Sequence, residues 1–139
     1  MIRSVYLASR CSRRDEMREV AAELRRRGYK VTSSWIDTDF PTASEGSSAA
    51  PPELHEKYAA ISVADLVRAD CCLSFTETPG TVMSRGGRAV EFGMALAWGK
   101  GLVIVGPCEN IFHHLRNVKV YDDLETMLNS VFPFRGDNP

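Results

Sequence analysis

The sequence predicts an α/β fold in which a parallel sheet carries helices on both faces. Short apolar runs of strand length alternate along the chain with segments whose apolar residues recur at helical spacing. The run at residues 102–106 is continuously apolar, which is typical of a strand covered on both faces. Five strands of such lengths favour the flavodoxin-like order 2-1-3-4-5, with ligands bound at the carboxyl ends of the strands.

Length and composition bound the function classes. With 139 residues, 44% of them hydrophobic, the chain suits one domain at residues 1–133 and a loose tail at 134–139. A formal net charge of -1 disfavours binding of a nucleic acid polymer. No apolar run reaches membrane-spanning length and no signal-like start is present, so we expect a cytoplasmic protein without membrane contact. The four cysteines lack metal-ligand spacing, so we expect reduced thiols and no metal site.

The first half of the chain contains two expected strands and a helix. Residues 5–8 form the first strand, and Ser12 with Asp15 resembles a capping box that opens a helix ended by Gly28. Residues 29–33 form the second strand. The Ser, Thr, Gly and Pro-rich residues 37–52 then make a loop long enough to have a functional role.

The second half adds three strands, at residues 71–75, 102–106 and 118–121, with helices between and after them. A helical pattern follows residue 52, but Ser62 and Asp65 form a second capping box, which predicts a break there. Asp65 would then lie in a first helical turn. The final helix is expected to start at Asp122.

Residues 84–101 form the centre of the predicted site, as a glycine loop that opens a helix. Val90, Met94 and Ala97 should face the sheet, which leaves Glu91 free to face a cleft. The glycines, the free amides of the first turn and two arginines suit an anion, and the helix dipole should keep Glu91 ionised. The alternative is a solvated Glu91 paired with Arg88.

Four segments together resemble the nucleoside 2-deoxyribosyltransferase superfamily, which includes transferases and N-glycoside hydrolases acting on nucleoside 5'-monophosphates. They are VYLAS at 5–9, ADLVRAD at 64–70, VEFGMA at 90–95 and VGP at 105–107. The resemblance implies that Glu91 is the nucleophile, that Tyr6 orients it and that Asp65 is the acid near the leaving base. It also implies retaining glycosidic cleavage through a glycosyl-enzyme ester, without cofactor or metal.

One departure from the family bears on the substrate. Transferases of this family usually carry an aspartate six residues before the nucleophile, where this chain has Arg85. An arginine suits a 5'-phosphate better than a sugar hydroxyl, so a nucleoside 5'-monophosphate hydrolase is favoured over a deoxyribosyltransferase and over a non-catalytic nucleotide-binding module. The expected substrate-binding residues are Ser9, Arg10, Ser84, Arg85, Gly86, Gly87, Arg88 and Asn110.

The resemblance further implies a homodimer or larger homo-oligomer, in which the region of Asn110 completes a neighbouring subunit's pocket. His113 and His114 should point apart and have no evident acidic or thiol ligand set, so they fit a loop or a subunit contact better than a metal site.

Overall fold

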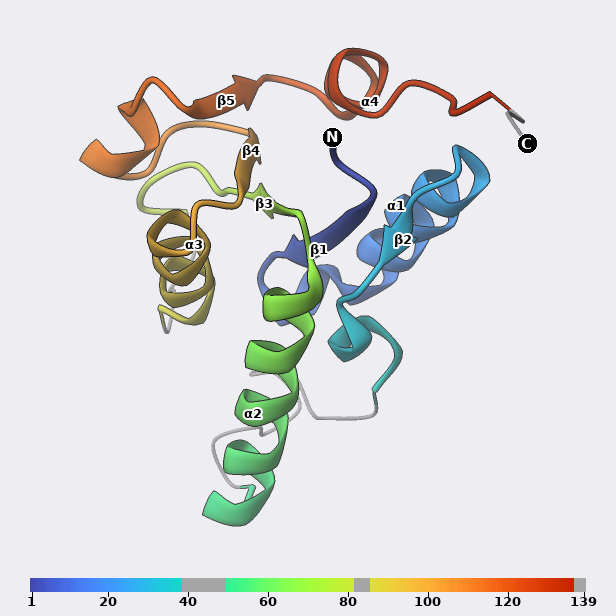
Figure 1. The fold of residues 1–139 in the computed structure, drawn as a ribbon. Coiled ribbons are helices and arrows are strands. Elements are labelled where there is room, and N and C mark those ends of the chain that lie inside the picture. The colour runs from blue at the N-terminus through green and yellow to red at the C-terminus, as the bar shows by residue number, and fades with distance from the viewer. Residues whose placement is uncertain (39–49, 82–85, 137–139) are drawn as a thin grey trace.

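A computed structural model describes residues 1–38, 50–81 and 86–136, and it contains a single five-stranded parallel sheet (Figure 1). The strand order is β2-β1-β3-β4-β5, which confirms the predicted topology. The strands are β1 Ser4–Ala8, β2 Lys30–Val31, β3 Cys71–Phe75, β4 Gly101–Val105 and β5 Val118–Tyr121. The order reverses between β1 and β3, where Tyr6 pairs with Cys72 in register.

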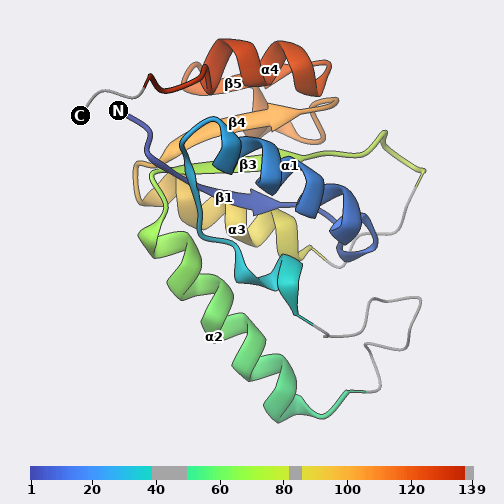
Figure 2. The same ribbon diagram turned by 90° about the vertical axis from the view of Figure 1, so that its right-hand side faces the viewer.

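Two layers of helices cover the sheet (Figure 2). Helices α1 (Arg14–Arg26) and α4 (Leu124–Val131) lie on one face, and α2 (Pro52–Arg68) and α3 (Gly87–Ala97) lie on the other. Short 3-10 turns are η1 (Cys11–Arg13), η2 (Ser34–Asp37) and η5 (Ile111–His114). Side chains alternate along β1, so Leu7 enters the α1/α4 core while Tyr6 enters the α2/α3 core.

The two capping boxes expected in the sequence do not form. Helix α2 runs unbroken through Ser62, so Asp65 lies near its carboxyl end rather than in a first turn. Helix α1 follows the turn η1, and its N-cap residue, Arg13, makes no side-chain cap. The Asp65 carboxylate accepts instead from Ser34, 31 residues earlier in the chain. A tertiary partner therefore outweighs the local capping pattern.

Other boundaries differ by a few residues. The second strand is limited to Lys30–Val31, because η2 begins at Ser34. The last helix starts at Leu124, and Asp123 rather than Asp122 caps it by accepting from the Thr126 amide at 2.8 Å. In the expected tail, the Arg135 amide donates to the Arg27 carbonyl at 3.0 Å, while residues 137–139 lie outside the described residues.

The face that α3 turns towards the sheet was predicted wrongly. Phe92 and Ala95 are its buried residues, whereas the side chain of Val90 is on the surface with an exposed fraction of 60%. The helix is rotated so that bulky Phe92 fills the core beside Tyr6. This rotation leaves Val90 and Glu91 beside the pocket described next. None of the helices described is both long and apolar enough to cross a membrane.

Candidate active site

A pocket of about 370 Å³ lies next to the carboxyl end of β1, on the face of the sheet covered by α2 and α3. Tyr6 enters it from β1, Ser62 from α2 and Glu91 from α3, while Ser9 lines it from the loop after β1. The sheet order reverses beside β1, which is where ligands of doubly wound sheets bind. The structure therefore brings together four of the predicted site residues, Tyr6, Ser9, Gly87 and Glu91, at the predicted edge.

Glu91 presents a buried carboxylate oxygen to this pocket. Its Oε2 has no hydrogen-bond partner of ordinary geometry among the described residues, and the same is true of the buried Tyr6 hydroxyl. The two groups are nevertheless close enough for each to shift the pKa of the other. Unsatisfied buried polar atoms are costly and rare outside functional sites, so this pair indicates a place where a ligand or reacting group belongs.

Burial raises the pKa of Glu91 to about 7, although the Tyr6 hydroxyl and the Arg88 guanidinium both pull it down. The expectation that the helix start keeps Glu91 fully ionised is therefore wrong. Glu91 is the fifth residue of α3, and the favourable effect of the helix dipole fades beyond the first turn, so desolvation dominates. Burial and the Glu91 charge raise the pKa of Tyr6 far above its usual value. Tyr6 therefore stays protonated and able to donate.

The glycine loop before α3 is described only in part. Ser84 and Arg85 lie outside the described residues, so the structure leaves their predicted roles open. Gly86 is the N-cap of α3 in the left-handed region, with φ of 87°, a conformation that side-chain-bearing residues rarely adopt. Gly87 lines the pocket as the first residue of the helix. The glycine pair thus sets the start of the helix that carries Glu91.

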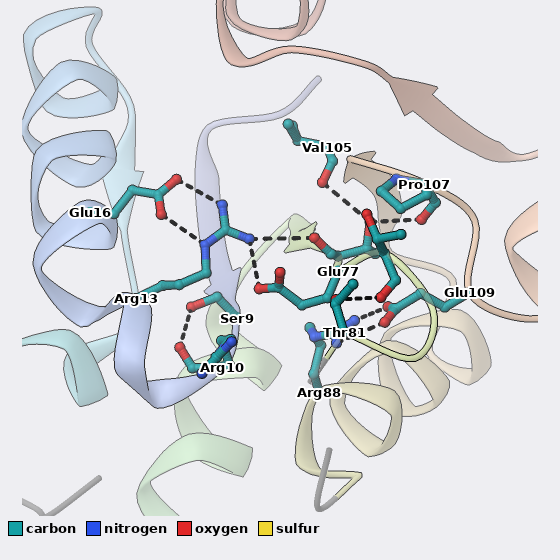
Figure 3. A network of polar contacts seen from close by, with 12 residues as sticks. Ser9, Arg10, Arg13, Glu16, Glu77, Thr81, Arg88, Val105, Pro107 and Glu109 are labelled. Atoms are coloured by element: carbon teal, nitrogen blue, oxygen red, sulfur yellow. Dashed lines mark hydrogen bonds and ion pairs between the residues drawn. The ribbon is translucent and has the colours of Figure 1, made fainter. Parts of the chain in front are cut away.

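Three other predicted binding residues lie outside the pocket lining. Arg88 forms a two-pronged ion pair with Glu109, from the segment after β4, rather than with Glu91 (Figure 3). Arg10 is exposed, and its carbonyl accepts from the Ser9 hydroxyl at 2.9 Å and from the Arg13 amide at 3.0 Å. Asn110 caps η5 by accepting from the Phe112 amide. The alternative of an Arg88–Glu91 salt bridge on a solvated helix surface is not what the structure contains.

The segment that holds Asn110 also holds His113, which is buried against the ring of Phe92. Its Nδ1 accepts from the Glu109 amide at 3.1 Å, and this contact holds the loop that pairs with Arg88. His113 therefore packs inside the subunit, where the sequence had suggested a loop or a subunit contact. Among residues 1–38, 50–81 and 86–136, no group of three or more His, Cys, Asp or Glu side chains could hold a metal ion.

Asp65 is buried but does not line the pocket. Its Oδ2 accepts from the Ser34 amide at 2.9 Å and from the Ser34 hydroxyl at 2.5 Å, and its Oδ1 is paired with Arg68. Oδ2 therefore fastens η2 to α2, while Oδ1 is held by an ion pair within α2 itself. The role of Asp65 as the acid near the leaving base stays a prediction, and the geometry favours a structural role.

Asp65→Asn separates these two roles. Replacement of one carboxylate oxygen by an amide leaves Arg68 unpaired and weakens the bonds to Ser34, so we expect a loss of about 1–3 kcal/mol in the free energy of unfolding. Denaturant titration measures that loss. At a temperature where the variant is folded, its activity should stay within about threefold of wild type, whereas removal of a general acid typically costs ~10²–10⁴-fold. A fall of that size in the folded variant would restore the catalytic role.

Several pocket residues were not among the sequence-based candidates. They come from α1, η2 and α2, and they include Arg14, Trp35, His55, Tyr58 and Ser62. The indole N–H of Trp35 donates to the Leu7 carbonyl at 2.8 Å, which fixes the ring at the pocket wall. Tyr58 and Ser62 are four residues apart on α2, so their sharing of one helix face could have been inferred if the helix had been read as continuous.

Fold and site together define a doubly wound α/β protein with a buried carboxylate and a tyrosine at its switch point. A search of solved structures finds that the fold is similar to that of a CMP N-glycosidase, BcmB, from Clostridium botulinum. The match covers 92% of this chain and 97% of that one, with a TM-score of 0.56 and 20% sequence identity. A scan against protein-family models and a search of curated proteins found no match.

Proposed function

We propose that this protein cleaves the N-glycosidic bond of a nucleoside 5'-monophosphate and releases the free base. The observation that carries the proposal is the Glu91 carboxylate, whose buried Oε2 has no hydrogen-bond partner of ordinary geometry among the described residues and which lies close to the Tyr6 hydroxyl in a pocket at the switch point. The structural likeness to a protein described as a CMP N-glycosidase supports the same chemistry. A protein that only bound nucleotides would have no use for a carboxylate held at this desolvation cost.

In the proposed mechanism, Glu91 in its ionised form attacks the anomeric carbon of the sugar. The bond from that carbon to the base nitrogen breaks, and the base leaves with the electron pair and takes up a proton from solvent. Water then attacks the same carbon of the glycosyl ester and gives up a proton to solvent, which yields the sugar phosphate and frees Glu91 as the carboxylate. Tyr6 acts as a positioning residue, because its hydroxyl favours the ionised carboxylate and stays neutral itself.

Two further features of the pocket suit a nucleotide. Aromatic surfaces of Trp35 and Tyr58 line it and offer flat apolar contact for a base. Arg14, at the start of α1, and the amino end of α3 at Gly87 offer positive charge and backbone amides for a phosphate. The phosphate is assigned to Arg14 rather than to Arg88, because Arg14 lines the pocket and Arg88 does not.

The test is chromatography of free base released from ribo- and deoxyribonucleosides and from their 5'-monophosphates, each with and without a second base as acceptor. Release from monophosphates without an acceptor is the expected result. Formation of a new nucleoside only when the acceptor is present would instead establish the transferase. Absence of release from every substrate, combined with binding of monophosphates, would establish the non-catalytic binding module.

Arg14→Gln tests the phosphate assignment. We expect kcat/KM for a 5'-monophosphate to fall by about 10–100-fold, because a hydrogen bond to a charged group contributes ~1.5–3 kcal/mol, while any activity on the nucleoside changes little. Arg10→Gln is the matched control, since Arg10 is close in the chain but does not line the pocket. Steady-state kinetics on both substrates measure the difference. Equal losses for nucleoside and monophosphate would remove Arg14 from phosphate recognition.

A further inference from the structure

A second pocket, of about 480 Å³, lies at the opposite edge of the sheet, where β1 and β2 begin. Four segments that are far apart in the sequence meet there. Arg3 comes from the start of β1, Lys30 from β2, Arg68 from the end of α2 and Arg135 from the chain after α4. The protein as a whole has a formal net charge of -1, so four cations around one cavity are a marked local excess.

Backbone contacts fix the position of each cation. The Lys30 amide donates to the Arg3 carbonyl at 3.0 Å, and the Ser4 hydroxyl donates to the Arg68 carbonyl at 3.2 Å. The Arg135 amide donates to the Arg27 carbonyl at 3.0 Å. These bonds belong to the main chain or to the Ser4 hydroxyl. These bonds do not use the charged ends of Arg3 and Lys30, whereas the Arg68 guanidinium pairs with Asp65 and the Arg135 guanidinium lies 5.8 Å from the centre of the Tyr29 ring.

Gly28 allows Arg135 to lie at this place. It has φ of 97°, and a Cβ built on it would come within 3.2 Å of the Arg135 Cβ. A side chain at position 28 would be strained and would push against Arg135. The residue that ends helix α1 thus also makes room for a cation of the pocket.

Nearby carboxylates neutralise little of this charge. Asp70 accepts through Oδ2 from the amides of Arg3 and Ser4, at 2.8 and 3.1 Å, and these bonds lower its pKa. Asp65 pairs with one nitrogen of Arg68, whose side chain stays 61% exposed. Within the described part of the chain, Arg3, Lys30 and Arg135 have no carboxylate within ion-pair distance.

We propose that this pocket binds an anion with two or more linked phosphate groups, such as pyrophosphate or the phosphate chain of a nucleoside triphosphate. A single exposed ion pair contributes only ~0–1 kcal/mol, so useful affinity requires one ligand that meets several cations together. An arginine guanidinium can donate two parallel hydrogen bonds to two oxygens of a phosphate group, and a chain of linked phosphates is long enough to contact several of these side chains together. The ligand occupies the amino ends of the strands, and Glu91 lies in a different pocket.

The probe is inorganic pyrophosphate, with binding to the full chain measured by calorimetry at low ionic strength. We expect saturable binding, and we expect Lys30→Gln combined with Arg135→Gln to weaken it at least tenfold. Arg3→Gln is a second variant that leaves its backbone bonds to Asp70 and Lys30 intact. Arg116→Gln is the matched control, because Arg116 is exposed and does not line the pocket. Circular dichroism verifies that each variant is folded.

Further binding measurements show whether the ligand is a free phosphate chain or a nucleoside triphosphate. They also test this proposal independently of the proposed function. ATP that binds no more tightly than pyrophosphate identifies the phosphate chain as the recognised part, and tighter ATP binding identifies a nucleoside triphosphate as the ligand. Glu91→Gln should keep pyrophosphate affinity whether or not the protein is a glycosidase. No binding by wild type, an equal loss in Arg116→Gln, or tighter binding of a single-stranded oligonucleotide would each overturn the proposal.

Discussion

Glu91→Gln should abolish base release while leaving the protein folded. Glutamine has nearly the shape of glutamate but cannot form the glycosyl ester, and removal of a catalytic nucleophile can cost ~10⁶-fold in kcat. We therefore expect base release to fall by at least about 10⁴-fold. Chromatography of the released base under single-turnover conditions measures the loss.

Glu77→Gln is the control for this variant. Glu77 lies beyond the carboxyl end of β3, where it pairs with Arg13 at 3.1 Å, and it does not line the pocket (Figure 3). The same change of charge at the same edge should leave base release within about threefold of wild type. Substantial activity in Glu91→Gln would remove Glu91 from the chemistry, and an equal loss in Glu77→Gln would assign the effect to the overall charge of this edge.

The same Glu91→Gln variant should also be more stable than wild type in alkaline solution. Burial raises the pKa of Glu91 in the folded protein from 4.5 to about 7, so the folded state favours the protonated form. As pH rises from about 4.5 to 7, wild type loses stability that glutamine cannot lose, and the gap reaches ~3 kcal/mol above pH 7 at 1.36 kcal/mol per pKa unit. Denaturant titrations at pH 4.5 and pH 8 measure the gap, which should nearly vanish at the lower pH.

The sheet could be predicted from the sequence because each strand is marked by a local pattern of residues. Each strand is a short apolar run, and a parallel sheet buried on both faces needs little more than such runs separated by helices. The strand order β2-β1-β3-β4-β5 follows the prediction, and the third and fifth strands have the expected bounds. Tyr6, Ser9 and Glu91 meet at the predicted edge, since the carboxyl ends of parallel strands share one side of the sheet.

The errors occur where a distant partner outweighs a local pattern. The spacing of Ser62 and Asp65 is that of a capping box at a helix start. In the structure, however, the Ser34 amide donates to the Asp65 carboxylate, and the helix continues through both residues. Arg88 pairs with Glu109, 21 residues away, and no local motif announces such a contact. The charge state of Glu91 follows from desolvation by the assembled pocket, which a sequence window does not reveal. The pocket residues from η2 and α2 were likewise not predicted, because they come close to Glu91 only in the folded chain.

The pH dependence of kcat/KM should report the ionisation of Glu91. Because the ionised carboxylate is the nucleophile and its pKa is about 7, kcat/KM should rise about tenfold per pH unit from pH 5 and level off above pH 7. Tyr6→Phe removes the hydroxyl that favours the ionised form, so the midpoint should move to higher pH. The substrate phosphate itself has a pKa of ~6. The midpoints of kcat/KM for Tyr6→Phe and for wild type are therefore compared on the same substrate, so that the contribution of the phosphate cancels.

Tyr29→Phe separates this electrostatic role from a general loss of packing. Tyr29 is also buried, and its hydroxyl donates to the Pro133 carbonyl at 2.8 Å, but it lies in the core under α1 and α4, away from Glu91. Its loss should lower the free energy of unfolding by about 1 kcal/mol and leave the kinetic midpoint in place. A midpoint that Tyr6→Phe does not move would remove Tyr6 as the residue that tunes Glu91. Activity that falls as pH rises through 7 would make Glu91 a proton donor instead of the nucleophile.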